Sequence, residues 1–350
     1  MIIIGPSVQP KDALLKENKI MGNIPITIVT GDYDRTRPIR DGRVSVEGCD
    51  VTHLSMNSSE IFFRAIRHQE FDVCELSFSN YMTQKQRGVA GYIAIPVFLS
   101  RIFRHSGIYI RTDRDIDKPE DLRGRTVGVQ EYPMTAAVWQ RGMLQDEYGI
   151  APSDISWRTG GMEQVGRVER APFTPPAGVD VTPIPADKTL STMLADGELD
   201  ALITPGAPSS FERGAPNIGR LFPNYREAEQ AYYSKTGLHP IMHLVAVRES
   251  LAEQYPWLCA SLYKAFRDAK KLAIADLENL GSLSIMLPWI GSELKATRAL
   301  LGDDFWPYGV AENKKDIDAL IRYSFEQGLT ERRLGVEELF AATTFEYAKI

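Results

Sequence analysis

Two stretches decide the fold: Gly107-Ile108-Tyr109-Ile110 and, a few residues later, Lys118-Pro119-Glu120-Asp121-Leu122-Arg123-Gly124-Arg125-Thr126-Val127-Gly128-Val129. Residues 107–110 predict a strand that leaves one lobe, and Thr126 to Val129 predict the first strand of a second lobe. Pro119 to Leu122 predicts a short helical turn between them. Phe103-Arg104-His105-Ser106 stands just before this crossing. Basic side chains at a crossing between lobes are expected to face the cleft.

The first lobe shows the alternation of strand and helix that is typical of α/β folds. Ile24 to Thr30 is a β-rich run, and Phe71 to Leu76 is a second one. Between them, Asn57 is a plausible helix N-cap, with Glu60 three positions later and apolar residues following on one helical face. The pattern predicts an α/β protein with mixed sheets flanked by helices.

The chain is expected to divide into an N-terminal arm and two lobes. Residues 1–23 form the polar arm, residues 109–240 form lobe 2, and residues 24–108 with 241–350 form a discontinuous lobe 1. Two passages join the lobes as a hinge. Expected helices are Thr135 to Tyr148, Pro256 to Leu277, Asn313 to Gln327 and Val336 to Tyr347, and residues 158–188, rich in Pro and Gly, are expected to run over the surface.

Composition narrows the class of protein. The 350 residues are 43% hydrophobic, enough for a large core, and the net charge is −6. An acidic chain is unsuited to broad nucleic-acid binding. Three cysteines without metal-ligand spacing predict buried thiols. No apolar run approaches the roughly 20 residues that span a bilayer, and no secretory leader is visible. We therefore expect a cytoplasmic protein without membrane contact, and a homo-oligomer is possible.

Charged residues follow the first strand directly. Asp32, Arg35 and Arg37 lie in Gly31-Asp32-Tyr33-Asp34-Arg35-Thr36-Arg37. Ligands of α/β proteins bind outside the carboxyl ends of strands, so this loop is expected to border the cleft. Arginine binds carboxylates in a bidentate manner. The alternative is a solvated turn with surface ion pairs.

A second strand end repeats this arrangement with polar side chains. Glu75, Ser77, Ser79 and Asn80 follow or close the strand near Leu76. Hydroxyl, amide and backbone N–H groups at a helix start suit a carboxylate ligand. Simple N-capping by Ser77 or Ser79 is the compatible alternative.

Lobe 2 is expected to present helix N-termini across the cleft. Tyr132 and Thr135 follow the strand that ends at Val129, and Thr204 follows a later strand. Ordinary strand-to-helix turns are the alternative interpretation.

Three histidines stand at the two crossings. His105 lies on the first, and His239 and His243 lie on the second. Residues four apart in a strand are separated by about 13 Å, so His239 and His243 are not expected to bind one metal ion together. A histidine in the cleft can exchange protons at neutral pH.

Several motifs together resemble the 4,5-dihydroxyphthalate decarboxylase family, from about Ile24 to the C-terminus. They are Gly31-Asp32-Tyr33-Asp34-Arg35-Thr36, Arg67-His68-Gln69-Glu70-Phe71-Asp72-Val73, Glu75-Leu76-Ser77, Phe103-Arg104-His105-Ser106, Gly160-Gly161-Met162-Glu163-Gln164, Gly166-Arg167, Thr189-Leu190-Ser191 and Pro240-Ile241-Met242-His243. The resemblance implies a type 2 periplasmic-binding-protein-like fold reused for decarboxylation.

The activity implied by the resemblance is conversion of 4,5-dihydroxyphthalate to 3,4-dihydroxybenzoate and CO2, with no cofactor and no metal. His105 or His243 would deliver the proton, and Asp32 or Glu75 would orient that histidine or accept a phenolic hydrogen bond. Arg35, Arg37 and Arg104 would hold the carboxylates. Further substrate contacts are expected from Ser77, Ser79, Asn80, Tyr132, Thr135, Thr204 and His239.

Two other hypotheses stay open at the level of sequence. One is a solute-binding protein that delivers an aromatic carboxylate to a transporter. The other is a metal-assisted decarboxylase or hydrolase that uses His105, His239 or His243 with Asp32 or Glu75.

Overall fold

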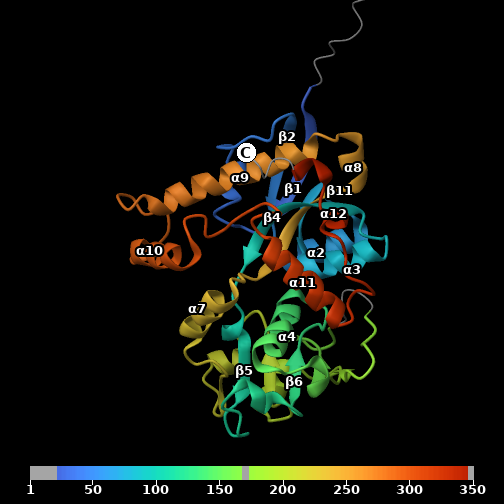
Figure 1. The fold of residues 1–350 in the computed structure, drawn as a ribbon, viewed down its shortest axis with the longest axis vertical. Helices are drawn as coiled ribbons and strands as arrows, with labels where there is room; N and C mark the ends of the chain where they lie inside the picture. Colours follow the sequence, from blue (N-terminus) through green and yellow to red (C-terminus); the bar gives the residue numbers. More distant parts are fainter. Residues whose placement is uncertain (1–21, 168–172, 346–350) are drawn as a thin grey trace, which may run out of the picture.

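The computed structural model describes residues 22–167 and 173–345. The expected arm, residues 1–23, therefore lies almost entirely outside the described residues. Figure 1 shows two lobes, one above the other, each built around its own sheet. None of the helices in the described ranges combines the length and apolarity needed to cross a bilayer.

The upper sheet has the strand order β2-β1-β3-β11-β4. Its strands are β1 (Ile24–Thr30), β2 (Cys49–Ser55), β3 (Val73–Ser77), β4 (Tyr92–Arg101) and β11 (Ile241–Arg248). Strand β1 pairs in parallel with β2 and β3, whereas β11 inserts antiparallel between β3 and β4. The late strand β11 thus completes a sheet that begins more than half a chain earlier, so lobe 1 is discontinuous.

The lower sheet has the order β10-β5-β9-β6-β7-β8. Its strands are β5 (Ile108–Arg111), β6 (Thr126–Val129), β7 (Ser156–Thr159), β8 (Val181–Pro183), β9 (Ala201–Ile203) and β10 (Ile218–Arg220). Strands β6 to β9 pair in parallel, and β5 is antiparallel to β9. Mixed sheets of this kind confirm the predicted fold class.

Helices cover both sheets. They are α1 (Arg37–Arg40), α2 (Ser58–His68), α3 (Phe78–Gln86), α4 (Thr135–Tyr148), α5 (Leu190–Ala195), α6 (Ser209–Glu212), α7 (Tyr225–Thr236), α8 (Glu249–Gln254), α9 (Leu258–Glu278), α10 (Ile290–Leu301), α11 (Lys314–Glu326) and α12 (Val336–Leu339). Short 3₁₀ helices occupy His105–Gly107, Pro119–Leu122, Pro152–Asp154 and Ala342–Thr344.

Local sequence explains where α2 and α4 begin and end. The side chain of Asn57 accepts a hydrogen bond from the Ser59 N–H, as predicted, and the apolar face of α2 is buried at Ile61, Phe62 and Ala65. Helix α4 ends at Gly149, whose φ of 66° is the left-handed conformation that favours glycine at a helix end.

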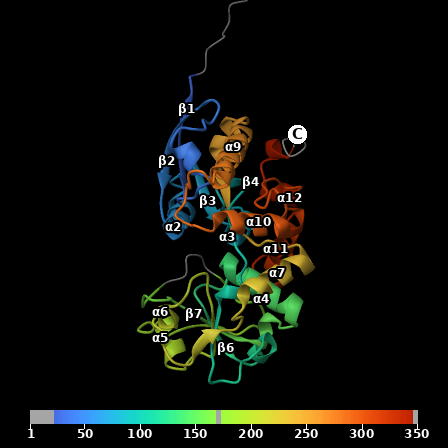
Figure 2. The ribbon, with the colours of Figure 1, turned by 90° about the vertical axis from the view of Figure 1, so that its left-hand side faces the viewer.

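The first crossing requires a glycine. A Cβ atom at Gly107 would lie 2.4 Å from the carbonyl oxygen of Thr204, so only glycine allows the chain to pass this close to β9. The second crossing connects α7 to β11. Figure 2 shows both lobes from the side, with α4 and α7 at the junction.

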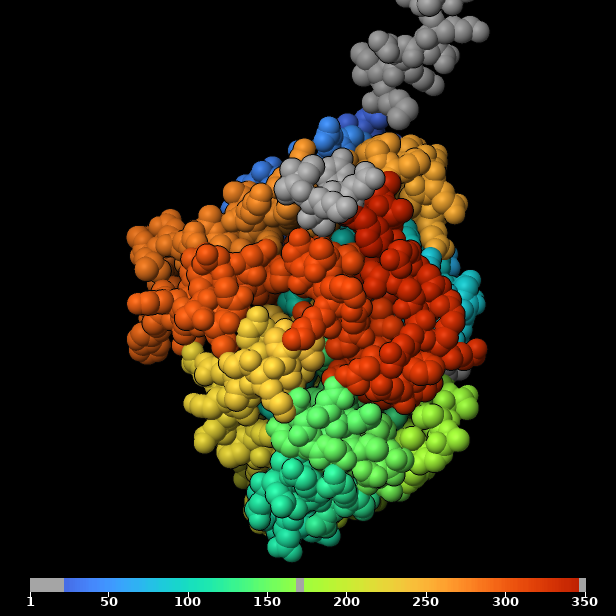
Figure 3. Space-filling view, viewed as in Figure 1, coloured from blue at the N-terminus to red at the C-terminus, as the bar shows by residue number. Residues whose placement is uncertain are grey.

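The two lobes share a docked helical interface. Helix α4 of lobe 2 packs against α11 of lobe 1, and on the face drawn in Figure 3 the two segments are in direct contact. The Arg141 Nε donates to Gln327 Oε1 at 2.8 Å, and Gln327 Nε2 donates to the Val138 carbonyl at 2.9 Å. One cluster of buried apolar residues runs through both lobes. Where α4 meets α11, the two lobes therefore share one apolar core.

One expectation about the elements is wrong. The helix predicted over Val336 to Tyr347 ends at Leu339, because Phe340 adopts an extended conformation and forms a parallel bridge with Ala94 of β4. The excursion predicted over residues 158–188 contains the edge strand β8, and residues 168–172 lie outside the described ranges. Helix α10 had no counterpart among the predicted elements.

Candidate active site

A cavity of about 170 Å³ lies between the lobes. It is lined from lobe 1 and the hinge by Ser58, Ser59, Phe62, Ser77, Asn80, Arg104, Met242 and His243, and from lobe 2 by Gln130, Glu131, Met134, Thr135, Ala136, Arg167 and Pro205. Polar and charged groups dominate this lining, and aromatic and thioether side chains complete it. The cavity is therefore suited to a small anionic molecule with an apolar ring.

His243 in the cavity wall is held by a buried carboxylate behind it. The His243 Nδ1 lies 2.6 Å from Glu75 Oε1, and the Glu75 side chain is 0% exposed. The Tyr33 hydroxyl donates to Glu75 Oε1 at 2.7 Å, and the Gly31 N–H donates to Oε2 at 2.8 Å. Burial opposes ionisation of Glu75, but hydrogen bonds and charge from His243, followed by Gly31 and Tyr33, hold its pKa below the ordinary value.

The tautomer of His243 follows from this environment. An ionised carboxylate only accepts hydrogen bonds, so Nδ1 of His243 carries a hydrogen and donates it to Glu75. The other ring nitrogen, Nε2, is left for a molecule in the cavity. Phe62 packs edge-on against the imidazole with ring centroids 4.8 Å apart, and also lines the cavity. The ring of His243 is thus fixed in position, orientation and tautomer.

Arg104 supplies a buried positive charge at the hinge. Its Nε lies 3.3 Å from Met242 Sδ and its Nη1 lies 3.5 Å from the Pro205 carbonyl. Burial lowers its pKa to about 10, against the influence of Glu229, so the guanidinium stays protonated at neutral pH. Within the described ranges, Arg104 makes no ion pair with a carboxylate. A buried guanidinium that lines a cavity without such a partner is a natural binding group for a carboxylate ligand.

The N-terminal ends of three helices meet at the cavity. Ser58 opens α2, Asn80 lies in the first turn of α3, and Thr135 opens α4. The positive ends of their helix dipoles favour negative charge. Helix α4 comes from the opposite lobe, as predicted from the sequence.

Hydroxyl groups join the two lobes beside the cavity. The Ser77 Oγ lies 2.8 Å from Thr135 Oγ1, and the Ser79 N–H donates to Thr135 Oγ1 at 3.1 Å. The Ser79 hydroxyl donates to the Pro133 carbonyl at 2.6 Å and does not line the cavity. Neither Ser77 nor Ser79 caps a helix through its side chain. These serines instead connect the lobes, which brings Ser77 and Thr135 to the cavity together.

A second charged pair lies on the lobe 2 side of the cavity. Glu131 follows β6 and is only 2% exposed, and Arg167 donates through Nη2 to Glu131 Oε1 at 2.6 Å. Both residues line the cavity. The cavity thus has an acid with a basic partner on one wall and a histidine with an acidic partner on the other.

The charged loop after β1 forms a surface network instead of a clamp. Arg37 Nε and Arg40 Nη1 lie 3.0 Å and 2.8 Å from Asp32 Oδ1, on exposed side chains. Arg35 hydrogen-bonds the Leu99 carbonyl and lies between the rings of Tyr33 and Trp306. Asp32, Arg35 and Arg37 are absent from the cavity lining. Arg37 pairs with Asp32, and Arg35 pairs with Asp34.

The other two predicted histidines lie apart from the cavity. His105 is buried between Phe222 and Tyr232, and burial lowers its pKa to about 4. His239 stacks on Phe103, and burial followed by the charge of Arg101 lowers its pKa to about 3. Burial therefore favours the neutral form of both rings. Only His243 among the three lines the cavity.

Two further predicted contacts also lie outside the lining. Tyr132 is fully buried in lobe 2, where its ring packs against Phe173 and the guanidinium of Arg141. Thr204 donates its hydroxyl to the Gly206 carbonyl at 3.0 Å. Their neighbours Glu131 and Pro205 line the cavity instead.

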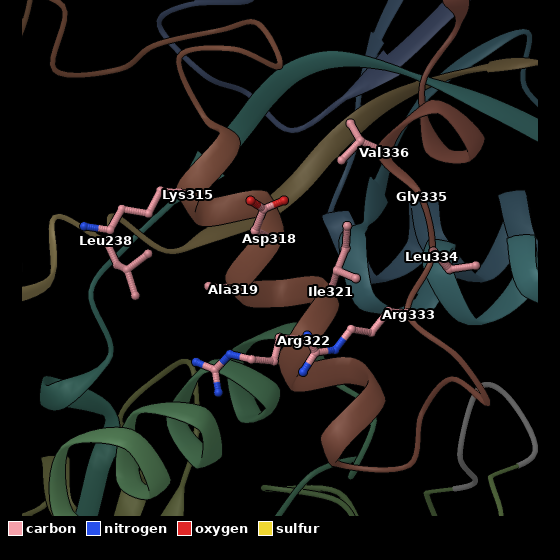
Figure 4. A pocket seen from close by; sticks show the side chains of 10 residues that line it. All are labelled: Leu238, Lys315, Asp318, Ala319, Ile321, Arg322, Arg333, Leu334, Gly335 and Val336. Carbon is pink, nitrogen blue, oxygen red and sulfur yellow. The ribbon is translucent and has the colours of Figure 1, made fainter.

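A larger groove lies elsewhere and contains none of the predicted site residues. Figure 4 shows this hollow of about 580 Å³ between α11 and residues 333–336. Its charged side chains are already paired: Arg322 with Asp146, Arg333 with Glu326 and Asp318 with Lys314. Lys315 also lines the groove, but none of the described lining residues is a histidine or a buried carboxylate that could transfer a proton.

Several lining residues were not assigned from the sequence. They are Ser58, Ser59, Phe62, Gln130, Glu131, Met134, Ala136, Arg167, Pro205 and Met242. Of these, Gln130, Glu131 and Met134 stand between Val129 and Thr135, where a helix N-terminus was predicted to face the cleft. Arg167 and Met242 stood in the family-like motifs. Tyr33, which supports Glu75 from behind, also lay in a quoted motif.

The residues named for a metal-assisted mechanism do not come together. His243 and Glu75 form one pair, whereas His105, His239 and Asp32 each lie in separate surroundings. Within the described ranges, no three His, Cys, Asp or Glu side chains are arranged to hold a metal ion.

Comparison with known structures supports the fold alone. The aliphatic sulphonate binding protein SsuA from Escherichia coli superposes with a TM-score of 0.52 at 12% identity, covering 90% of this chain and 91% of that protein. Residues 44–167 match a family described as the periplasmic substrate-binding protein of a phosphonate ABC transporter. A binding-protein fold hosts different functions, so it does not decide between transport and catalysis.

Sequence relatives are more specific. A protein named 4,5-dihydroxyphthalate decarboxylase from Comamonas testosteroni is 44% identical over 330 residues, covering 94% of this chain and 100% of the relative. A protein of the same name from Pseudomonas putida is 44% identical over 220 residues, covering 63% of this chain and 85% of the relative. With this identity along almost its whole length, the chain belongs to the 4,5-dihydroxyphthalate decarboxylase family.

Proposed function

We propose that this protein converts 4,5-dihydroxyphthalate to 3,4-dihydroxybenzoate and CO2 in the cavity between the lobes. The observation that carries the proposal is the pairing of His243 with the buried Glu75 in the same cavity as the buried Arg104. The first is a proton-transfer unit, and the second is a cation without a carboxylate partner in the described ranges. Together they suit an anionic substrate whose reaction needs a proton.

Arg104 and the helix N-termini would hold the carboxylates of the substrate. The substrate is a dianion, and the buried guanidinium can form two parallel hydrogen bonds to one carboxylate. Ser77 and the first turns of α2 and α3 offer further donors on the lobe 1 side of the cavity. Phe62 gives the aromatic ring an apolar surface to pack against.

His243 would act as the general acid. In its imidazolium form, it transfers the Nε2 proton to the ring carbon that bears the departing carboxylate. That carbon becomes tetrahedral, and the ring hydroxyl para to it supplies electron density and releases its proton. The C–C bond then breaks, its electron pair returns to the ring as CO2 leaves, and the hydroxyl regains a proton. One proton is consumed for each CO2 released, and the route requires no redox cofactor.

The alternative is a protein that only binds an aromatic carboxylate for a transporter, as the fold permits. Such a protein needs the cation and the helix N-termini, but it has no need of a histidine fixed in one tautomer by a buried carboxylate. The Glu75–His243 pair therefore favours catalysis over simple binding.

The proposal is tested by incubating the purified protein with 4,5-dihydroxyphthalate and measuring CO2 and 3,4-dihydroxybenzoate. We expect the two products in equal amounts, and in deuterium oxide we expect deuterium at the carbon that lost its carboxylate. Saturable binding of the substrate without product would favour the solute-binding function instead.

We further propose that the enzyme works in the cytoplasm. The relatives are named as decarboxylases, and Cys49, Cys74 and Cys259 are all buried free thiols, as in proteins of reducing compartments. Assembly into a homo-oligomer stays a prediction.

A further inference from the structure

We propose that Glu131 recognises the two ring hydroxyls of the substrate, so that this carboxylate on lobe 2 determines the specificity for a dihydroxylated ring. The proposal rests on the function proposed above and assigns a role to a residue that the reaction scheme leaves unused. Its basis is the position of Glu131 in the cavity wall, its burial and its ion pair with Arg167.

A buried carboxylate in a site for a dianion needs an explanation. Glu131 would repel a substrate carboxylate placed next to it, so it disfavours any binding mode that turns the diacid toward lobe 2. A carboxylate accepts hydrogen bonds and, when ionised, donates none. The groups on this substrate that can donate to it are the phenolic hydroxyls.

The geometry of the cavity matches the geometry of the substrate. His243 lies on β11 of lobe 1, whereas Glu131 follows β6 of lobe 2, so the two groups face the cavity from opposite lobes. In 4,5-dihydroxyphthalate, each hydroxyl is para to one carboxylate, which puts the diol across the ring from the diacid. With the carboxylates held near Arg104 and His243, the hydroxyls point toward the wall that carries Glu131.

Arg167 holds Glu131 in place for binding the ring hydroxyls. Its Nη2 lies 2.6 Å from Glu131 Oε1, which balances the charge of the buried carboxylate and fixes its orientation. The two oxygens of a carboxylate together accept about four hydrogen bonds, so a carboxylate in an ion pair can also accept from hydroxyl groups. As the ring carbon is protonated by His243, the para hydroxyl can pass its proton to Glu131 and receive it back when CO2 leaves.

The test compares two non-reacting ligands by isothermal titration calorimetry. One is 3,4-dihydroxybenzoate, which carries the diol, and the other is benzoate, which lacks it. We expect Glu131→Gln to lower the affinity for 3,4-dihydroxybenzoate by about tenfold or more, as for a lost hydrogen bond to a charged group. Benzoate affinity should change by no more than about threefold, because its carboxylate binds elsewhere.

Two further variants complete the design. Glu131→Asp keeps the charge and should retain part of the preference for the diol, which separates recognition from a general loss of structure. Arg104→Met should lower the affinity for both ligands to the same extent, because both carry a carboxylate. If Glu131→Gln lowered the affinity for both ligands equally, or for neither, the role of Glu131 would be overturned while the proposed activity would stand. Failure of the wild-type protein to bind either ligand would overturn both.

Discussion

The His243 Nδ1 lies 2.6 Å from Glu75 Oε1, and the two residues belong to neighbouring antiparallel strands. In the register of β11 and β3, His243 pairs with Ser77 and Val245 pairs with Glu75, so the imidazole reaches the carboxylate diagonally across the sheet. The backbone of a central strand pair therefore fixes this contact. A site on paired strands is more precisely held than one on a flexible loop.

Glu75→Gln should lower kcat while leaving ligand binding nearly intact. The amide cannot replace the charged acceptor of Nδ1–H, so His243 loses its fixed tautomer and orientation. We expect at least about a tenfold loss in kcat, a part of what a general acid contributes, with phthalate affinity within about threefold of wild type. Tyr33→Phe removes one supporting bond and should give a smaller loss. Unchanged kcat in Glu75→Gln would show that the carboxylate does not position the histidine.

Arg104→Met should bind phthalate much more weakly and yet unfold at a higher temperature. Within the described residues, the guanidinium is buried without an ion pair, so its removal relieves a desolvation cost. We expect phthalate affinity to fall by about 100-fold, as for truncation of one partner of a buried charge pair. Calorimetric titration and thermal melts of the ligand-free protein measure the two effects.

Arg101→Met is the matched control for Arg104→Met. Arg101 is equally buried, but its Nη1 lies 3.0 Å from Asp316 Oδ2. Its loss leaves Asp316 buried and unpaired, so we expect destabilisation by about 3–5 kcal/mol. If both variants lost stability alike, Arg104 would be a structural residue instead of a ligand-binding one.

His105 should make the protein less stable in mild acid. Burial lowers its pKa from 6.5 to about 4, so the unfolded chain binds more protons between these values. Stability is therefore full above pH 6.5 and decreases as pH falls toward 4. A shift of this size corresponds to roughly 3 kcal/mol.

His105→Met should remove that part of the pH dependence. The free energy of unfolding, measured by denaturant titration at pH 7 and pH 4.5, should differ less in this variant than in wild type. Its turnover should stay within about threefold of wild type, because His105 does not line the cavity. A pH profile identical to that of wild type would mean that the pKa of His105 does not differ between the folded and unfolded protein.

Gly142→Ala should loosen the junction between α4 and α11. An added Cβ would lie 2.5 Å from the ring of Tyr323, which is itself buried. Overpacking of this kind costs about 1–3 kcal/mol. Gly206→Ala is the control, since no atom lies within 4 Å of a Cβ there. Equal melting temperatures for the two variants would argue against tight docking of the lobes.

The fold was predictable where local signals were complete. Strands Ile24–Thr30 and Thr126–Val129 and helix Thr135–Tyr148 were predicted with the bounds that the structure has, because caps, glycines and β-branched runs mark their ends. The end of the last helix was not predictable, because the extended conformation of Phe340 depends on a long-range bridge to Ala94.

The site was predictable only in part, for a related reason. His243, Glu75 and Arg104 could be named because strand ends and crossings meet at a cleft. Asp32 and Arg37 are also an acid and an arginine at the end of a strand, but they pair with each other on the surface. The sequence does not show which charged residues will form such pairs. Arg167 lies far from β6 in the chain, and only tertiary structure brings it to Glu131.

The central claim is tested most directly by comparing wild type and His243→Asn for CO2 release from 4,5-dihydroxyphthalate and, in parallel, for binding of phthalate. We predict that the variant binds phthalate within about threefold of wild type but releases CO2 at least about 100-fold more slowly, as expected for loss of a general acid. A His243→Asn variant that releases CO2 as fast as wild type would contradict the account.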